Sequence, residues 1–403
     1  MLLSYHLSLS IEGASILTDQ SHIRRIRQEM PAATARLYLN TGTFGPLPTC
    51  AIQAMQEYLN MQYRYGRLGA DAWEAMGAAY SNARASVARL LNADVSEIAL
   101  TDNTGEGMNI ISHGFNWHEG DEVITTNHEH ISALGPLYQL RDRYGVVIRV
   151  ADIGPVADQP VREHIADLMT ARTRLIALSH VAWTTGARFN ISEVAAMGRE
   201  AGVPVAVDGA QSAGAIPIDV KALGVDFYAI PMQKWLCGPD GTGGLYVRRE
   251  SLEYISPTYV GYFSIKHEGD AEWALNDNAQ RFELGGRQTA ALAGQGAVLN
   301  WLEETVGYDW LYQRIAALNT YAYNTLQTIP GLTLLTPVPG ASGLLSFRLE
   351  DRAPEDIVQR LCDGYNIYIR SIPSMQSVRI STGFYNTEEE IDTLARALRE
   401  IVM

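Results

Sequence analysis

The chain contains only three lysines, so chemistry that needs a primary side-chain amine has few candidates. Lys234 follows an apolar run and precedes Trp235 and a glycine-rich turn, GPDGTGG. Lys221 and Lys266 lie in polar stretches that are typical of surface charges. Burial among apolar residues lowers the pKa of an amine and makes it a better nucleophile toward a carbonyl carbon. Lys234 is therefore the candidate for a residue that forms an imine.

An acid and an amide precede this lysine in the string DGAQ. Asp208 ends the apolar run 203–207, at the carboxyl end of a predicted strand, where open parallel sheets bind their ligands. Pyridoxal 5'-phosphate needs an amine for its aldehyde and an acid that keeps its ring nitrogen protonated. Gln211 could donate to the phenolic oxygen of the same ring. The alternative is that Asp208 caps the next turn and Lys234 lies in a surface loop.

Two other kinds of site fit the sequence less well. The glycines at 238–244 are followed by a predicted strand, whereas a nucleotide loop leads into a helix, and neither G-x-G-x-x-G nor G-x-x-x-x-G-K-[ST] occurs. His128 and His130 could hold a metal from one strand, but no third ligand follows at a suitable spacing and HExxH is absent. We therefore expect no metal site, and a buried structural role stays open for either histidine.

The composition excludes several classes of protein. The 403 residues are 47% hydrophobic and 19% charged, which is typical of a compact globular protein and not of a disordered one. A net charge of −14 disfavours binding to nucleic acid or to anionic membranes. The chain shows no export signal, no long apolar run and no paired cysteine spacing. We expect a cytoplasmic protein with a small-molecule substrate.

The elements that must position the candidate residues alternate between short apolar runs and helical segments. The helical pattern at 192–202 ends at Gly202, a typical C-terminal stop. Such an alternation predicts an α/β fold whose mostly parallel sheet is covered by helices on both faces. The predicted strands lie at 97–100, 121–126, 146–150, 174–179, 203–207, 226–230 and 244–248.

The pattern changes after about residue 300 and predicts a second, smaller α+β unit. Thr387 and Glu390 have the spacing of a capping box that starts the last helix. The predicted elements are helices at 309–328 and 354–363 and strands at 332–336, 343–349 and 366–370. The predicted domains are an N-terminal arm (1–35), a large cofactor-binding domain (36–275) and an interdomain helix with a small C-terminal domain (276–403).

The sequence resembles the class V aminotransferase and cysteine desulfurase group of pyridoxal-phosphate enzymes with fold type I. The resemblance extends from YLNTGTFGPLP (38–48) to RISTGFYNTEEEID (379–392). Within the group it is most similar to the cystine C–S lyases. The strings that carry this similarity are TDNTGEGMNII (101–111), LSHVAWTTG (178–186), SPTYVGYFSI (256–265) and RFELGG (281–286). The resemblance implies the transferase fold, with a mostly parallel seven-stranded sheet in the large domain and a small α+β C-terminal domain.

The resemblance also implies roles around the cofactor ring and the substrate. Lys234 matches the Schiff-base lysine, Asp208 the partner of the ring nitrogen and Gln211 the partner of the phenolic oxygen. His130 matches the histidine that stacks on the ring and shuttles protons. Arg379 matches the arginine that binds the substrate α-carboxylate, for which bidentate geometry is well suited.

Arg370 is a second candidate for binding the substrate carboxylate. For Arg379 and Arg370 alike, a surface ion pair is the alternative.

For the cofactor phosphate, the resemblance implies the backbone amides of Thr104 and Gly105 at a helix N-terminus. Without it, the string NTGEG is an ordinary helix cap. Related desulfurases carry serine and histidine just before the lysine, where this chain has Pro231 and Gln233. Proline cannot donate a hydrogen bond, so the site must be built differently. The resemblance further implies that a glycine-rich turn with Gly286 and Arg287 completes the phosphate site of a neighbouring subunit, which implies a homodimer.

The sequence gives less information about which reaction is catalysed than about the cofactor. Met375 lies where one branch of desulfurases carries its cysteine, and the interval from Arg370 to Arg379 is short for the cysteine loop of the other branch. The sequence therefore predicts a lyase and not a persulfide-forming desulfurase. Lys234 would take the Cα proton, and cystine or a related cysteine derivative would yield pyruvate, ammonia and a sulfide or persulfide. The alternatives are a class V aminotransferase, a racemase similar to isopenicillin-N epimerase, and a non-catalytic binding protein with the same fold.

Overall fold

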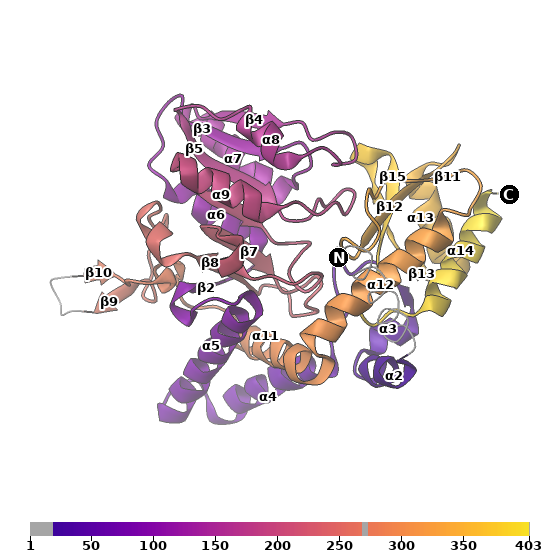
Figure 1. The fold of residues 1–403 in the computed structure, drawn as a ribbon. Coiled ribbons are helices and arrows are strands. Elements are labelled where there is room, and N and C mark those ends of the chain that lie inside the picture. Colours follow the sequence, from indigo (N-terminus) through magenta and orange to yellow (C-terminus); the bar gives the residue numbers. More distant parts are fainter. Residues whose placement is uncertain (1–18, 268–272, 403) are drawn as a thin grey trace, which may run out of the picture.

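A computed structural model describes residues 19–267 and 273–402, and a seven-stranded sheet forms the centre of its larger part (Figure 1). The strand order is β2-β8-β7-β6-β5-β3-β4. Strand β8 runs antiparallel to both of its neighbours, and the other pairs are parallel. The predicted α/β class and mostly parallel seven-stranded sheet are confirmed. The strands are β2 (Ile98–Thr101), β3 (Glu122–Thr126), β4 (Val147–Ala151), β5 (Thr173–Ser179), β6 (Val205–Asp208), β7 (Phe227–Pro231) and β8 (Gly243–Val247).

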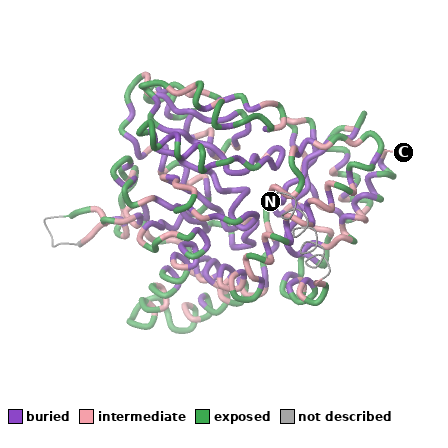
Figure 2. The backbone as a smooth tube through the Cα atoms, viewed as in Figure 1, coloured by how far each residue is buried: buried purple, intermediate pink, exposed green. Residues whose placement is uncertain are grey.

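Helices cover both faces of this sheet, as the continuous apolar strands require. In β6, Ala206 packs with one face, whereas Val205 and Val207 pack with the other, because successive side chains of a strand point to opposite sides. The burial pattern in Figure 2 shows the resulting interior. Helices α6 (Thr104–Gly114) and α7 (Ile131–Tyr144) cover the first face, and α5 (Ala70–Leu91), α8 (Val161–Ala166), α9 (Ile191–Ala201) and α10 (Val220–Leu223) the second.

The C-terminal part contains its own antiparallel four-stranded sheet, of order β11-β12-β15-β14, and helices that pack on it (Figure 1). The capping box is confirmed, since the Glu390 amide lies 3.3 Å from Thr387 Oγ1 and the Thr387 amide 3.1 Å from Glu390 Oε2. The strands are β11 (Leu332–Leu334), β12 (Leu344–Leu349), β14 (Arg370–Ile372) and β15 (Ser377–Ser381), and the helices are α12 (Tyr308–Leu326), α13 (Pro354–Tyr365) and α14 (Glu388–Val402).

Strand β15 is absent from the sequence prediction, which placed the last strand at 366–370. It forms because Ser377–Ser381 pairs with β12 on one side and β14 on the other. A short parallel pair, β1 (Leu37–Tyr38) with β13 (Ile367–Tyr368), ties the start of the chain to this domain. The missed strand carries Arg379, so only the tertiary pairing shows where this side chain lies.

The remaining helices connect the two parts. Helix α11 (Thr289–Trp301) packs on α4 (Thr49–Tyr65) and α5 and leads through a π turn (Leu302–Val306) into α12. The three cysteines are free. No described helix is long and apolar enough to cross a membrane. The other elements are helices α2 (Gln20–Gln28) and α3 (Pro31–Ala35), the hairpin of β9 (Ile265–His267) and β10 (Trp273–Leu275), and 3-10 turns at Val95–Glu97, Arg249–Glu253, Ala279–Phe282 and Pro373–Met375.

The predicted domain boundaries stay a prediction, although the two sheets take strands from separate stretches of the chain. Residues 1–18 of the predicted N-terminal arm lie outside the described residues.

Candidate active site

A cavity of about 220 Å³ lies at the carboxyl ends of β6 and β7, where a parallel sheet is expected to bind its ligand. Most of the predicted site residues line it, although they come from separate loops. The predicted residues at its wall are Thr104, Gly105, His130, Asp208, Gln233, Lys234 and Arg370. The residues that the sequence analysis did not single out are Thr43, Phe44, Asn103, Ser132 and Ala210, with Pro231 completing the wall.

Lys234 is held in the turn after β7 by the segment around Gly45. The Gly45 amide donates to the Gln233 carbonyl oxygen at 2.7 Å, and a Cβ atom on Gly45 would lie 2.1 Å from the Lys234 carbonyl oxygen. Only glycine therefore allows this approach. Burial lowers the pKa of Lys234 to about 8, while the Asp208 carboxylate opposes this fall and Arg379 adds to it. Such an amine is largely neutral in mildly alkaline solution, as a nucleophile or base requires.

Asp208 is the last residue of β6 and is almost completely buried. One carboxylate oxygen accepts the Ala210 amide at 2.8 Å, which is the turn-capping contact of the alternative interpretation. Burial raises the pKa of Asp208, and the Lys234 ammonium and the Ala210 amide oppose this rise. The capping contact occupies one oxygen only, so the acid still has an oxygen for a protonated ring nitrogen.

His130 caps helix α7 through its own ring. The Ser132 amide donates to Nδ1 at 3.2 Å, so the proton of the neutral ring is assigned to Nε2. Burial lowers the pKa of His130 to about 4, with further lowering by Lys234 and Arg370. The ring meets Trp183 edge-on, with the ring centres 5.1 Å apart. A neutral imidazole therefore faces the cavity.

The metal alternative for the two histidines has no support in the described part of the chain. His128 is buried, with Nδ1 2.7 Å from Thr184 Oγ1 and Nε2 2.8 Å from the Gly154 carbonyl oxygen. Both ring nitrogens are thus occupied by protein groups. No group of three suitable ligands occurs among the residues that the structure describes.

Two arginines lie side by side because β14 and β15 pair Arg370 directly with Arg379. Arg379 is fully buried, and its Nη1 donates to the Trp183 carbonyl oxygen at 2.5 Å, while Nε and Nη2 have no partner. Burial, with a smaller contribution from Arg370, lowers the pKa of Arg379 to about 9. Arg370 donates to Thr43 Oγ1 at 3.4 Å and lies over the Trp183 ring, 5.5 Å from its centre.

Neither guanidinium forms an ion pair with a carboxylate of residues 19–267 or 273–402. Buried charges are normally paired, so two unpaired guanidiniums beside a cavity indicate an anionic ligand.

The residues at the N-terminus of α6 form a second anion-binding feature at the opposite wall. Asn103 caps the helix by accepting the Glu106 amide at 3.0 Å. Thr104 Oγ1 is buried without a hydrogen-bond partner, and so is Gln233 Oε1 nearby on the cavity wall. A helix N-terminus with an unused hydroxyl suits a phosphate group, so this wall fits the phosphate of the predicted cofactor.

Three predicted site residues are not at the cavity wall: Arg379, which is buried behind it, Gln211 and Gly286. The Gln211 amide donates to the Gly42 carbonyl oxygen at 2.8 Å and accepts from Trp235 Nε1 at 2.9 Å, which fixes it within the packing. Gly286 is exposed, with a φ of +69°, in the loop before α11. Its expected role concerns a neighbouring subunit and stays a prediction.

Sequence reasoning missed Thr43 and Ser132, which contact Arg370 and His130. The only signal for Ser132 is its spacing of two residues from the histidine that it orients.

The comparisons with known proteins agree with this site. The model of the class V aminotransferase family matches residues 37–394. A probable cysteine desulfurase of Methanothermobacter thermautotrophicus is 31% identical over 395 residues, covering 93% of this chain and 97% of the relative. A cysteine desulfurase of Enterobacter sp. is 30% identical, covering 94% and 98%.

Among solved structures, the cystine C–S lyase C-DES in complex with its reaction product cysteine persulfide has a TM-score of 0.88 and 30% identity, covering 92% of this chain and 99% of that chain.

These relatives show that excluding a persulfide-forming desulfurase was wrong. The relatives at 30–31% identity are named cysteine desulfurases. The exclusion assumed that a persulfide requires an enzyme cysteine at the position of Met375. Yet cysteine persulfide is the reaction product named for the lyase C-DES, so one missing thiol does not separate the two kinds of enzyme. The methionine at one loop position therefore does not exclude a desulfurase.

A C-DES variant with 30% identity and a TM-score of 0.89 carries glycine covalently linked to its pyridoxal-phosphate cofactor. The site in this chain supplies a buried amine at Lys234, an acid at Asp208 and a phosphate-binding helix end at Thr104, so it fits the same cofactor. The cofactor of this protein is pyridoxal 5'-phosphate. The chain belongs to the class V aminotransferase family, within its group of cysteine desulfurases and C–S lyases.

Proposed function

We propose that this enzyme cleaves the Cβ–S bond of cystine or a related cysteine derivative and releases pyruvate, ammonia and a sulfide or persulfide. The observation that supports the proposal is that Arg370 lines the same cavity as Lys234 and Asp208, while Arg379, its partner across β14 and β15, has two buried nitrogens without a hydrogen-bond partner. The name of the similar structure C-DES, a cystine C–S lyase, supports this choice of substrate.

Each residue of the site has a separate role in substrate binding or proton transfer. Arg379 binds the substrate α-carboxylate through Nε and Nη2, and Arg370 assists from the adjacent strand. Lys234 Nζ takes the Cα proton as a general base, helped by its pKa of about 8. The bound cofactor supplies an electron sink for the electrons left at Cα. Asp208 would hold a proton on the ring nitrogen of that cofactor, and the neutral His130 ring would help to bind the ring from the cavity wall.

Product analysis tests this function. The purified enzyme is incubated with cystine, cysteine and a panel of other amino acids, with and without an added keto acid. Pyruvate and a persulfide without keto acid support the lyase. Amino transfer that depends on a keto acid identifies an aminotransferase, and loss of chirality without net breakdown identifies a racemase. No turnover by protein that binds the cofactor would leave only the non-catalytic alternative.

Cysteine desulfuration is a second candidate, because the names of the curated relatives favour it. The two reactions differ in the carbon product. Desulfuration of cysteine leaves alanine, whereas β-elimination leaves pyruvate. Quantifying both products from isotopically labelled cysteine and cystine therefore separates the two candidates in a single assay.

We also infer a homodimer, which the role predicted for Gly286 requires. Exposed apolar side chains gather on α4, α5 and the loops beside them, where a partner subunit would cover them. They are Phe44, Leu47, Ile52, Leu59, Leu68 and Trp73. Light scattering of the purified enzyme tests this, and a monomer that retains full activity would refute it. A cytoplasmic location likewise stays a prediction.

A further inference from the structure

An ion cluster around the buried side chain of Arg287 lies beside the phosphate-binding wall, and none of its members lines the cavity described above. Arg287, in the loop before α11, has only 9% of its side chain exposed. Its Nη2 donates to Glu106 Oε1 at 2.8 Å, and its Nη1 donates to the Asp102 carboxylate. The Arg287 amide donates to the Tyr80 hydroxyl oxygen at 3.2 Å. The guanidinium is therefore held in one place by two acids.

These two acids stand on either side of the residues that face the phosphate. Asp102 precedes and Glu106 follows the segment Asn103–Gly105, which forms the cavity wall. The Asp102 backbone amide also donates to the Glu106 carboxylate, so the Glu106 side chain reaches back across the start of the helix. A phosphate ester carries up to two negative charges near neutral pH, and unpaired carboxylates at this position would repel it.

We propose that Arg287 is a positioning residue for the cofactor phosphate, acting through Asp102 and Glu106. It neutralises the two carboxylates, so the N-terminus of α6 keeps its attraction for an anion. Arg287 does not line the cavity and need not contact the phosphate. The inference rests on the proposed phosphate wall at Thr104 and Gly105 and adds the residue that makes this wall electrostatically favourable.

The test compares two ligands that differ only in the phosphate group. The dissociation constants of pyridoxal 5'-phosphate and of pyridoxal are measured on cofactor-free protein by the change in visible absorption. The Arg287→Met variant should bind the phosphorylated ligand about 10-fold or more weakly at low ionic strength, with less loss at high salt. Its affinity for pyridoxal should change by less than about 2-fold, since pyridoxal carries no phosphate charge.

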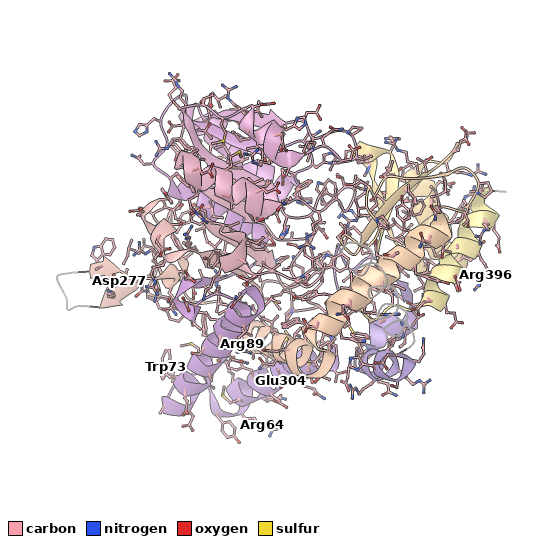
Figure 3. All side chains as sticks on the ribbon, viewed as in Figure 1. Arg64, Trp73, Arg89, Asp277, Glu304 and Arg396 are labelled. Atoms are coloured by element: carbon pink, nitrogen blue, oxygen red, sulfur yellow. The ribbon has the colours of Figure 1, made fainter. Side chains whose placement is uncertain are left out.

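A rescue variant separates charge from structure. Adding Asp102→Asn and Glu106→Gln to Arg287→Met removes both carboxylates while keeping oxygens that accept hydrogen bonds. Binding of the phosphorylated ligand should return to within about 3-fold of the wild-type value. The control is Arg89→Met, which breaks an ion pair of the same length, 2.8 Å, between Arg89 on α5 (labelled in Figure 3) and Glu303. This control should leave both affinities unchanged.

Four results would overturn the proposal. Equal weakening for both ligands in Arg287→Met would mean a general structural role, and no weakening would mean no role. Failure of the triple variant to recover, while the free energy of unfolding stays at the wild-type value, would exclude neutralisation as the mechanism. If the wild-type protein itself binds both ligands equally well, the phosphate wall is wrongly placed. Product analysis would then still decide the reaction independently.

Discussion

Replacing Arg379 with methionine should make the ligand-free protein more stable while nearly abolishing its activity. The guanidinium is fully buried and two of its nitrogens have no partner. Its pKa falls from 12.5 to about 9, and at about 1.4 kcal/mol for each pKa unit this gives a ceiling of about 5 kcal/mol for the cost of the buried charge. The bond to the Trp183 carbonyl oxygen is lost in the variant, so we expect a net gain of about 2 kcal/mol in the free energy of unfolding at pH 7.

The stability difference between Arg379→Met and the wild type should depend on pH in a defined direction. Between pH 9 and 12.5 the unfolded chain keeps the Arg379 proton and the folded chain loses it, so the stability of the wild-type protein rises with pH there. The advantage of Arg379→Met should therefore be full at pH 7 and smaller at pH 10. Denaturant titrations of cofactor-free protein at both pH values measure it. The exposed Arg396→Met on α14 is the control and should change stability by less than about 0.5 kcal/mol (Figure 3).

Activity should move in the opposite direction. Removing one partner of a buried, hydrogen-bonded charge pair costs about 2–5 kcal/mol, so kcat/KM for the amino-acid substrate should fall about 100-fold or more. A variant that is less stable than wild type at pH 7, or one that is equally active, would refute the assignment of Arg379 as an unpaired carboxylate-binding residue.

Three further changes test other parts of the site. Lys234→Ala should lose the imine absorption that the cofactor-bound protein shows in the absence of amino acids, and an unaltered spectrum would exclude the amine at 234. Gly45→Ala should lower the free energy of unfolding by about 2 kcal/mol, because its Cβ would clash with the Lys234 carbonyl oxygen. The control, Gly77→Ala at an open helical position, should raise the free energy of unfolding by about 0.5 kcal/mol. Equal effects of the two substitutions in urea titrations would contradict this prediction. Burial raises the pKa of Glu129 to about 7. Its contribution to the free energy of unfolding is therefore full below about pH 4.5, where the acid is protonated in both states, and is lost as the pH rises through 7. Glu129→Gln should therefore gain about 3 kcal/mol over wild type between pH 5 and pH 9, and parallel stability curves would refute a buried protonated acid.

The candidate site was predictable where one stretch of sequence defines both the element and the chemistry. Asp208 and Lys234 follow apolar runs that become β6 and β7, and parallel strands end at the same edge of a sheet. The capping box at Thr387 was equally local. The strands β6 and β7 and the capping box depend on hydrophobic periodicity and on capping contacts, which involve only a few neighbouring residues and can therefore be predicted from the sequence.

The reaction class could not be read from one position. Met375 suggested that desulfurases were excluded, and the named relatives show that this was wrong. The partners of Gln211 were also not readable from the sequence, since its amide group contacts Gly42 and Trp235, and its role toward the phenolic oxygen of the cofactor stays a prediction. In both cases the residue type was known, but its partners were not.

What the sequence alone determined is the set of strands in the large sheet, the amine and the acid at the ends of two of them, and the cofactor that these groups suit. Only the tertiary structure determined which charged side chains lie next to one another. Strand pairing brings Arg370 beside Arg379, and loop packing brings Arg287 to the acids at the start of α6. Residues so far apart in the chain meet only through the pairing and packing of whole elements, and no local pattern encodes the distance between them.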